Sequence, residues 1–384
     1  MSFVFQSVPK LVCEIGGLAR TGELMAGLGA RRVVVVCDAG IRACGFAAKA
    51  AASLRDAGIE PLIHDGVQAD PPVAVVLAAV DAAREFGADG VAGLGGGSSL
   101  DTAKLVALLL RSEQKIEEMF GTDLATGKRS PLIQIPTTAG TGSEVTWVSV
   151  VTNAAGEKKA VYSRQLLPDI AILDAELTVG MPPKVTAATA LDAMVHAVEA
   201  YTSRTRKNPI ADCLALKALD LLCGNYAKVL RNGHDMAARA AMLQGAMLGG
   251  MAFINASVAS VHALAYPLGA RFHVPHGHSN ALVMGPVFRF NLPVAAGLYA
   301  ELASAVLPGQ GFANASAAAE AFVAELDRLA ALGGLEMRMG KLGVSEDDIP
   351  SMAQEVTVGI QRLLANNPRD MTQTDVEELY RSIL

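Results

Sequence analysis

The sequence predicts two domains, an α/β domain with a mostly parallel sheet followed by an all-helical domain. The chain has 384 residues, enough for two domains of ordinary size. In its first half, short β-branched runs alternate with alanine-rich helical segments, a pattern typical of parallel sheets covered by helices. From Met181 onward, helical patterns follow one another with few strand signals. We therefore expect domains at residues 1–180 and 181–384, with a ligand cleft between them.

In the first half, strands are expected where apolar β-branched residues run together. The clearest is Arg32–Cys37, RVVVVC, whose unbroken apolar run indicates burial on both faces. The expected strands are Arg32–Cys37, Glu60–His64, Gly90–Leu94 and Pro131–Pro136, and the helices between them are Phe46–Ala57, Pro72–Phe86 and Ser98–Leu110. In the second half, Pro182 and Pro183 open a helical pattern. Helices are expected there over Ala187–Thr202, Ile210–Leu230 and Ala237–Phe253.

Composition excludes several classes of protein. The chain is 51% hydrophobic and 18% charged with a net charge of −6, which describes a well-packed globular protein. The absence of basic runs argues against nucleic acid or an anionic membrane as partner. The apolar runs fall short of the ~20 residues that span a bilayer, and the start lacks signal-peptide features. Five cysteines without a CxxC pair fit a reducing compartment, so we expect a cytoplasmic protein.

A glycine-rich loop follows the strand Gly90–Leu94 and opens a helix. Gly95, Gly96 and Gly97 allow close approach of the backbone to a ligand, and the N–H groups at a helix start favour an anion. Ser98 with Asp101 three residues later resembles a capping box. The motif therefore predicts a phosphate site, with a tight, well-capped turn as the alternative.

Two further features fit a nucleotide. The loop Thr137-Thr138-Ala139-Gly140-Thr141-Gly142-Ser143-Glu144 also follows a strand, and its hydroxyls suit a diphosphate or a ribose, although an ordinary turn-rich loop has the same composition. Asp38 ends the first strong strand, where an acid can accept hydrogen bonds from a ribose 2′-hydroxyl, or can cap the following helix. The acid precedes the glycine loop, the reverse of the usual dinucleotide motif, so the expected fold is Rossmann-like with a different chain order.

A metal site is indicated by polar residues in apolar surroundings. Asp192, His196 and Glu199 are spaced four and three residues apart, and therefore share one helix face. Four of the seven histidines lie within Val258–Asn280: His262, His273, His276 and His278. A carboxylate with three imidazoles suits a divalent metal such as iron or zinc, with Glu199 as an outer partner. The alternative is a surface stripe with scattered imidazoles.

These motifs together resemble the iron-containing, group III alcohol dehydrogenase family over essentially the whole chain. The matching segments are GGGSSLDTAK at 95–104, PTTAGTGSEVT at 136–146, GMPPKVTAATALDAMVHAVEAYTS at 180–203, the VHALAYPLG to PHG stretch at 261–277, and NNPRDMT at 366–372. The resemblance implies a dehydroquinate synthase-like architecture, with a nucleotide-binding domain and a helical metal-binding domain. It also implies dimers or larger homo-oligomers.

The resemblance further implies roles for individual residues. The metal ligands would be Asp192, His196, His262 and His276, which leaves His273 and His278 as ordinary imidazoles. The cofactor contacts would be Asp38, Gly95, Gly96, Gly97, Ser98, Thr137, Thr138, Thr141, Lys158 and Leu177. Phe253 would line the substrate pocket. Trp147 is a further candidate for that pocket, with core packing as the alternative.

One position departs from the family. Many members have a second histidine one turn after the first metal histidine, where a proton-relay role is proposed. This chain has Tyr266 there. With an ordinary pKa near ~10, a tyrosine is a poor proton acceptor at neutral pH. The departure predicts a relay through water or the ribose, or an altered substrate preference.

The resulting functional hypothesis is reversible oxidation of primary alcohols to aldehydes, with NAD rather than NADP accepting hydride and a divalent metal polarising the substrate oxygen. Iron is the expected metal, and zinc or another divalent ion is the alternative. Other enzymes of the same architecture remain open, namely a glycerol-dehydrogenase-like zinc enzyme and a maleylacetate-type reductase. A dehydroquinate-synthase-like lyase and a non-catalytic nucleotide-binding module are further alternatives.

Overall fold

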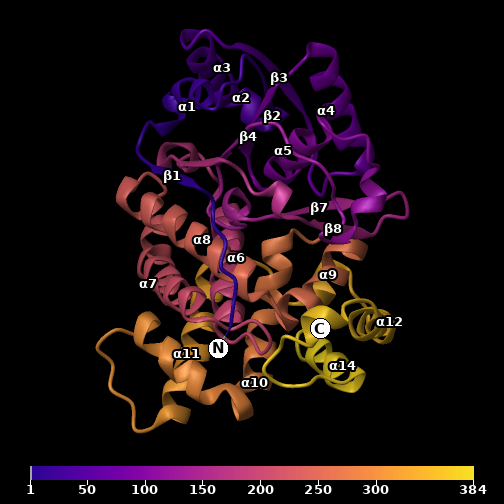
Figure 1. Ribbon diagram of the computed structural model, residues 1–384. Coiled ribbons are helices and arrows are strands. Elements are labelled where there is room, and N and C mark those ends of the chain that lie inside the picture. The colour runs from indigo at the N-terminus through magenta and orange to yellow at the C-terminus, as the bar shows by residue number, and fades with distance from the viewer. Residues whose placement is uncertain (1) are drawn as a thin grey trace. The chain divides into compact units, whose positions relative to one another are not determined.

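The computed structural model describes residues 2–384, which form two compact units (Figure 1). Residues 7–180 make the α/β unit, and residues 181–384 make the helical unit together with residues 2–6. The sequence had placed those first residues with the α/β domain. They group with the helical unit because Gln6 donates its N–H to Asn255 Oδ1 at 2.8 Å, and Asn255 Nδ2 donates to the Gln6 carbonyl at 2.9 Å.

The elements of the α/β unit follow the expected alternation. Its strands are β1 (Lys10–Cys13), β2 (Arg32–Asp38), β3 (Glu60–Val67), β4 (Gly90–Gly95), β5 (Gly121–Thr122), β6 (Leu132–Pro136), β7 (Val148–Thr152), β8 (Lys158–Tyr162) and β9 (Ile170–Leu173). Its helices are α1 (Thr21–Gly27), α2 (Ala39–Ala43), α3 (Phe46–Asp56), α4 (Val73–Phe86) and α5 (Gly97–Leu109), with short 3₁₀ helices that include η3 (Ser143–Val145) and η5 (Ala175–Thr178). Every strand and helix expected in this half is present, with small shifts at the ends.

The main sheet is parallel throughout, in the order β1-β9-β6-β4-β2-β3. The predicted parallel α/β fold is therefore confirmed. Three parts were not expected: the short strands β1 and β9 at one end of the sheet, and a second sheet in which β7 and β8 pair antiparallel.

The alternation of side chains along β2 explains its unbroken apolar sequence. Val34 and Val36 pack into a core with residues of α4 and α5. Val33 and Val35 pack into a second core with residues of α1 and α3. Because successive side chains point to opposite faces, a strand covered by helices on both faces needs an apolar residue at every position.

The helical unit contains no strand among the described residues from 181 to 384, as predicted. Its helices are α6 (Pro183–Tyr201), α7 (Pro209–Arg231), α8 (Met236–Ala256), α9 (Ser260–Phe272), α10 (His276–Val306), α11 (Ala315–Leu332), α12 (Ile349–Gln354), α13 (Gln361–Leu364) and α14 (Gln373–Ser382). The central helix is α6, which packs against α7, α8 and α10 and is buried over almost its whole length after the first turn. Polar side chains on α6 therefore have no route to water and must find partners inside the protein.

Two helices, α8 and α10, are long and apolar enough to cross a membrane by length and composition. Half or more of the apolar stretch in each is buried against other parts of the protein. Core helices of water-soluble proteins have the same properties, so these helices are weak evidence of a membrane.

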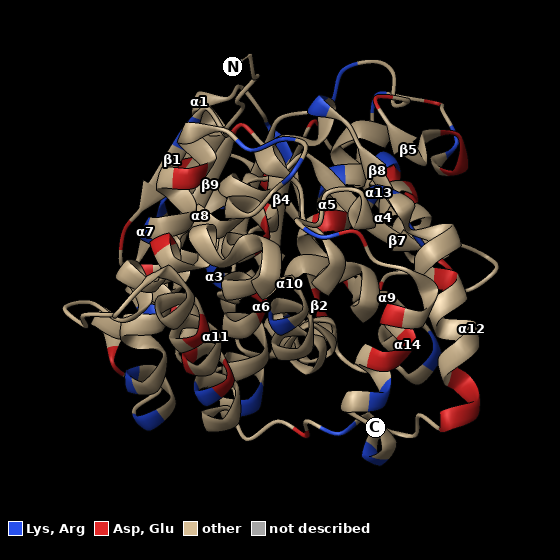
Figure 2. Ribbon diagram, turned by 90° about the horizontal axis from the view of Figure 1, so that it is seen from below, with Lys and Arg blue, Asp and Glu red and all other residues tan. Residues whose placement is uncertain are grey.

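Acidic and basic residues are interspersed along the ribbon of Figure 2, and the described chain shows no run of basic residues.

Candidate functional site

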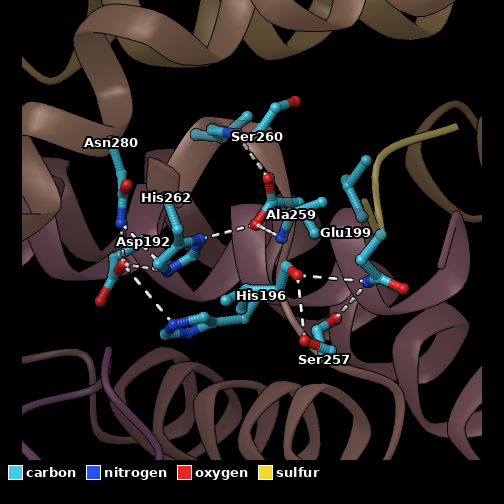
Figure 3. A network of polar contacts seen from close by, with 12 residues as sticks. Asp192, His196, Glu199, Ser257, Ala259, Ser260, His262 and Asn280 are labelled. Carbon is cyan, nitrogen blue, oxygen red and sulfur yellow. Dashed lines mark hydrogen bonds and ion pairs between the residues drawn. The ribbon is translucent and has the colours of Figure 1, made fainter. Parts of the chain in front are cut away.

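Four side chains of the helical unit meet at one point: Asp192, His196, His262 and His276. One ligand atom from each lies within 4.8 Å of the others. The Asp192 Oδ1 atom is 3.7 Å from His196 Nε2, 3.8 Å from His262 Nε2 and 3.6 Å from His276 Nε2. Figure 3 shows the Asp192 carboxylate and the rings of His196 and His262 pointing toward one another.

These separations fit a single divalent ion. Ligands ~2.1 Å from a tetrahedral metal lie about 3.4 Å apart, so the carboxylate–imidazole distances need only a small contraction. Asp192, His196 and His262 are each less than 5% exposed, whereas His276 is half-buried. A buried carboxylate facing three imidazole nitrogens is a donor set that iron and zinc accept. The residues present therefore fit the metal that the sequence predicted.

The four side chains of the cluster come from three helices. Asp192 and His196 are one turn apart on α6, and His262 is the third residue of α9. His276 is the first residue of α10, which lies against α6 at this point. Gly277 allows that approach, because a Cβ there would lie 2.3 Å from the carbonyl oxygen of Ala188 on α6.

Replacing Gly277 with alanine should therefore weaken metal binding. The new methyl group would meet backbone, so the start of α10 must move away from α6 and take His276 with it. We expect a loss of roughly 1–3 kcal/mol in stability and at least tenfold weaker metal affinity, measured by chelator competition. Gly297→Ala is the control in the same helix, since its Cβ would meet no described heavy atom within 4 Å. Unchanged affinity in Gly277→Ala would contradict the assigned geometry.

Glu199 orients His262, the role expected of an outer partner. His262 Nδ1 lies 2.6 Å from Glu199 Oε2, and both side chains are buried. The carboxylate also accepts the N–H groups of Ala259 at 2.8 Å and Val261 at 2.6 Å. Because a carboxylate only accepts, Nδ1 must carry the proton, and Nε2 keeps its lone pair toward Asp192. Figure 3 shows His262 between Asp192 and Glu199.

Asn280 is a residue of this site that the sequence did not reveal. Its Nδ2 donates to Asp192 Oδ1 at 2.7 Å and lies 3.3 Å from both His262 Nε2 and His276 Nε2. Burial opposes ionisation of Asp192, but the three imidazoles and Asn280 outweigh it and hold the pKa of this carboxyl below its ordinary value. Asn280 lies four residues after His276, one helical turn away, and this spacing could have indicated that the two side chains share a helix face.

The remaining sequence candidates in this unit lie around the cluster. Phe253 stacks on the His196 ring, with centroids 4.3 Å apart, and so fixes the orientation of that ring. The ring of Tyr266 is 6.3 Å from that of His276. His273 is an exposed residue in the left-handed conformation after α9, and His278 Nε2 contacts the Glu336 carbonyl at 2.6 Å. Neither belongs to the four-residue cluster.

In the α/β unit, the two predicted loops lie side by side at the carboxyl ends of β4 and β6. The Thr137 N–H donates to the Gly95 carbonyl at 2.9 Å. A Cβ on Gly96 would lie 3.5 Å from Thr138 Cγ2, and one on Gly97 would lie 2.9 Å from Thr141 Cγ2. This edge is where parallel α/β sheets bind nucleotides.

The capping box expected at Ser98 and Asp101 is wrong. Gly96 is the N-cap residue of α5, and no described side chain caps this helix, so its first N–H groups are available to an anion. Asp101 instead accepts the Val150 N–H at 2.8 Å and the Ser143 hydroxyl at 2.6 Å. The fully buried Lys104 donates to Ser143 Oγ at 2.7 Å. Asp101 and Lys104 thus tie the second loop to α5, a role that the sequence analysis missed.

Asp38 caps the helix α2, one of the two roles expected for it, and also lies close to the residues that follow the glycine loop. Its Oδ1 accepts the Ile41 N–H at 3.0 Å, while Oδ2 lies 3.4 Å from the Ser99 hydroxyl. One carboxylate oxygen thus faces the start of α5.

The other predicted cofactor and pocket residues of this unit lie on several elements. Lys158 on β8 forms an ion pair with Asp70 at 2.7 Å. Leu177 in η5 is buried in the core beneath the main sheet. Trp147 is half-buried, and its carbonyl accepts the Ser163 N–H at 3.0 Å. No contact described for these three joins them to the glycine loop.

The buried carboxyl of Glu144 should make the stability of the protein depend on pH. Burial raises the pKa of this carboxyl to about 7 from an ordinary 4.5. Between pH 4.5 and 7 the folded state holds a proton that the unfolded state releases. The stabilisation that the protonated carboxyl gives the folded state is therefore complete below pH 4.5 and is lost as the pH rises through 7. We expect Glu144→Gln to be about 3 kcal/mol more stable than the natural protein at pH 8.5, with the difference vanishing near pH 4.5. Urea unfolding at several pH values measures this, and a difference independent of pH would refute it.

Comparisons with known proteins show the family of the chain. The profile of the family described as "Iron-containing alcohol dehydrogenase" matches residues 9–175, and that of "Fe-containing alcohol dehydrogenase family, C-terminal" matches residues 186–384. The chain is 38% identical to long-chain-alcohol dehydrogenase 1 of Geobacillus thermodenitrificans, covering 92% of this chain and 90% of that protein. It is 31% identical to the NAD-dependent methanol dehydrogenase of Bacillus methanolicus, covering 98% of each. A crystal structure of 1,3-propanediol oxidoreductase superposes with a TM-score of 0.96 at 32% identity over 100% of both chains.

Proposed function

The chain belongs to the iron-containing alcohol dehydrogenase family and is an alcohol dehydrogenase, and from that premise we propose that it uses iron and NAD to interconvert primary alcohols and aldehydes. The observation that carries the proposal is the convergence of one buried carboxylate and three imidazoles at a single point. A non-catalytic nucleotide-binding module would have no use for this arrangement.

In this proposal Asp192, His196, His262 and His276 hold the metal. When bound, the metal supplies a Lewis acid for the substrate oxygen, and NAD supplies the hydride acceptor. The protein fixes the charge and geometry of the site: Glu199 keeps the proton of His262 on Nδ1, and Phe253 holds the ring of His196. Since His276 alone of the four is half-buried, the substrate is proposed to enter beside it.

Tyr266 is proposed to shape this open side rather than to accept a proton. Its ring is tilted against that of His276 with centroids 6.3 Å apart, so it lies beside the entry that we propose. An ordinary tyrosine hydroxyl can donate a hydrogen bond to a substrate oxygen, but it does not act as a base near neutral pH. The proton released from the alcohol then leaves through water or a cofactor hydroxyl.

The two adjoining loops are proposed to bind NAD. The N–H groups at the start of α5 suit the diphosphate, and Thr138 and Thr141 beside Gly96 and Gly97 offer hydroxyls. The methanol dehydrogenase relative is NAD-dependent by name, which supports the choice. Lys158, Leu177 and Trp147 are proposed as contacts only on the strength of the family resemblance. A homo-oligomer is proposed on the same basis. A cytoplasmic location is proposed because the five cysteines fit a reducing compartment.

Asp38 is proposed to select NAD over NADP, because its carboxylate would repel a 2′-phosphate. Asp38→Gly should therefore raise the relative kcat/KM for NADP at least tenfold, since a single repulsive contact of this kind is worth about 1.4 kcal/mol or more. Steady-state rates with both cofactors measure the change. An unchanged ratio of the kcat/KM values for NAD and NADP would show that Asp38 does not select the cofactor. The same variant also loses the helix cap that Asp38 provides to the Ile41 N–H. That loss should lower the stability of the protein, but by itself it should not alter the NAD:NADP ratio.

The decisive experiment measures NADH formation with metal-free protein reloaded with iron under anaerobic conditions, or with zinc, across a series of primary alcohols of increasing length and diols. Alcohol-dependent NADH formation that requires added metal supports the proposal. A loaded protein that forms no NADH with any alcohol and reduces no aldehyde would refute it. The metal giving the higher kcat at equal occupancy decides between iron and zinc.

A further inference from the structure

The motif NNPRDMT near the C-terminus has no part in the proposed chemistry, yet its two asparagines are among the most buried polar residues of the helical unit. Asn366 and Asn367 are each 1% exposed. A buried side-chain amide must find hydrogen-bond partners within the protein. The partners of these two amides lie on the segment that leads into α9, just beyond the end of α6, and within α10.

The segment Ala256–Ser260, here called the α8–α9 link, is irregular and buried. Ser257 has φ 75° and ψ 154°, a conformation that L-residues rarely adopt. Every residue of the link is less than 9% exposed, so its backbone groups also need partners. The link ends two residues before His262, and Glu199 accepts a hydrogen bond from its Ala259 N–H. Its conformation therefore determines where His262 meets Glu199.

Asn366 joins this link to the end of α6. Its Nδ2 lies 3.2 Å from the Val258 carbonyl and 3.4 Å from the Ala256 carbonyl. Its Oδ1 accepts the Ser203 hydroxyl at 2.9 Å and the Thr205 hydroxyl at 2.6 Å. Ser203 and Thr205 lie within four residues of the end of α6, the helix that carries Asp192, His196 and Glu199. Figure 3 shows Ser257 at the end of the network away from Asp192.

Asn367 joins α9 to α10. Its Oδ1 accepts the Ser260 hydroxyl at 2.5 Å and Asn291 Nδ2 at 3.0 Å, and its Nδ2 donates to Asn291 Oδ1 at 2.8 Å. Ser260 is the first residue of α9, and Asn291 lies within α10. The four proposed metal ligands come from α6, α9 and α10. The two consecutive asparagines therefore form hydrogen bonds to each of these helices or to the residues that flank it.

We propose that Asn366 and Asn367 are positioning residues that hold α6, α9 and α10 in the register the metal site needs, and so set its metal affinity. This rests on the proposed function of the four-residue cluster. The asparagines touch no ligand themselves. They act through the α8–α9 link on His262 and Glu199, and through Asn291 on the helix that begins with His276.

The test compares Asn366→Ala and Asn367→Ala with Asn208→Ala. Asn208 is a matched control, because it is also 1% exposed in the helical unit but caps α7, and its contact nearest to the link is a long one of 3.5 Å to the Asn255 carbonyl. Zn²⁺ affinity is measured by chelator competition, and the site geometry by the visible spectrum of Co²⁺-loaded protein. We expect both link variants to bind Zn²⁺ at least tenfold more weakly and to show an altered Co²⁺ spectrum. Asn208→Ala should lose thermal stability but keep both properties.

If either variant fails to fold, two serine variants should still weaken Zn²⁺ binding severalfold. Ser260→Ala removes one hydroxyl bond to Asn367, and Ser203→Ala removes the hydroxyl that contacts Asn366 Oδ1, the Ala256 carbonyl and the Arg206 N–H. Folded variants with the natural affinity and Co²⁺ spectrum would overturn the positioning role, as would an equal loss in Asn208→Ala. His262→Ala separates the two proposals. If the natural protein and His262→Ala bound Zn²⁺ equally, the metal assignment itself would be wrong and the positioning role would fall with it.

Discussion

Replacing His262 with alanine is expected to abolish both metal retention and alcohol-dependent NADH formation. The imidazole is 3% exposed, and its Nε2 atom faces the Asp192 carboxylate at 3.8 Å. Without it the site keeps three of its four ligands, so we expect metal affinity to fall more than about 100-fold, beyond the loss caused by removing an outer partner. Metal analysis after gel filtration and steady-state kinetics on reloaded protein measure the two effects.

The same variant should also lose the stabilisation that the metal confers. A ligand present at about 100 times its Kd stabilises the folded state by about 2.7 kcal/mol. Denaturant unfolding of the natural protein should therefore shift on adding metal, and that of His262→Ala should not. His276→Ala is a useful companion because it removes a ligand while leaving the Glu199 carboxylate fully paired.

His278→Ala is the matched control for this prediction. His278 lies in the same histidine-rich stretch, but it contacts the Glu336 carbonyl and stands outside the cluster. It should retain metal and turnover while losing some stability. Full activity in a metal-free His262→Ala protein, or equal metal loss in His278→Ala, would contradict the assignment of the ligands.

Much of this site follows from helix periodicity and from short motifs. The spacing of Asp192 and His196 on an apolar helix indicates a buried polar pair before any tertiary contact is known. The run RVVVVC likewise identifies a strand covered on both faces. In both cases the information lies within one element, where sequence spacing translates directly into geometry.

What could not be predicted depends on contacts between distant segments. No sequence pattern marks Asn280, and the motif that contains Asn367 does not reveal its partners; only the packing of α10 and the C-terminal segment brings both residues into the network. Ser98 and Asp101 have the spacing of a capping box, but tertiary bonds to Ser143 and Val150 take Asp101 away from that role. The four-residue strands β1 and β9 are too short to show a period of two and are stabilised by their neighbours in the sheet.

Glu199→Gln is expected to weaken metal binding about 10- to 100-fold, although Glu199 touches no metal. The carboxylate accepts three hydrogen bonds, from the N–H groups of Ala259 and Val261 and from His262 Nδ1. A glutamine offers one oxygen and one NH₂ group. In either orientation its NH₂ group must face a buried donor, and each unsatisfied group costs about 1–3 kcal/mol.

If the NH₂ group replaces Oε2, it faces both His262 Nδ1 and the Ala259 N–H, and His262 can relieve its own part of the conflict by changing tautomer. If the proton moves from Nδ1 to Nε2, Nδ1 can accept a hydrogen bond from the glutamine, but Nε2 then points an N–H group at the Asp192 side of the cluster. The lone pair that the metal needs is lost. The expected result is therefore a shift of the ¹⁵N resonances of His262 between the two tautomers, together with weaker Zn²⁺ binding in chelator competition.

Glu144→Gln provides a control with the same substitution at an equally buried carboxyl. Both side chains are 2% exposed, but Glu144 belongs to the α/β unit and contacts no imidazole among the described residues. If burial of the glutamine alone were responsible, both variants would change Zn²⁺ affinity equally. A loss confined to Glu199→Gln, with the tautomer change of His262, would show that the carboxylate acts through the proton it holds on Nδ1. Natural affinity with an unchanged tautomer would exclude that role.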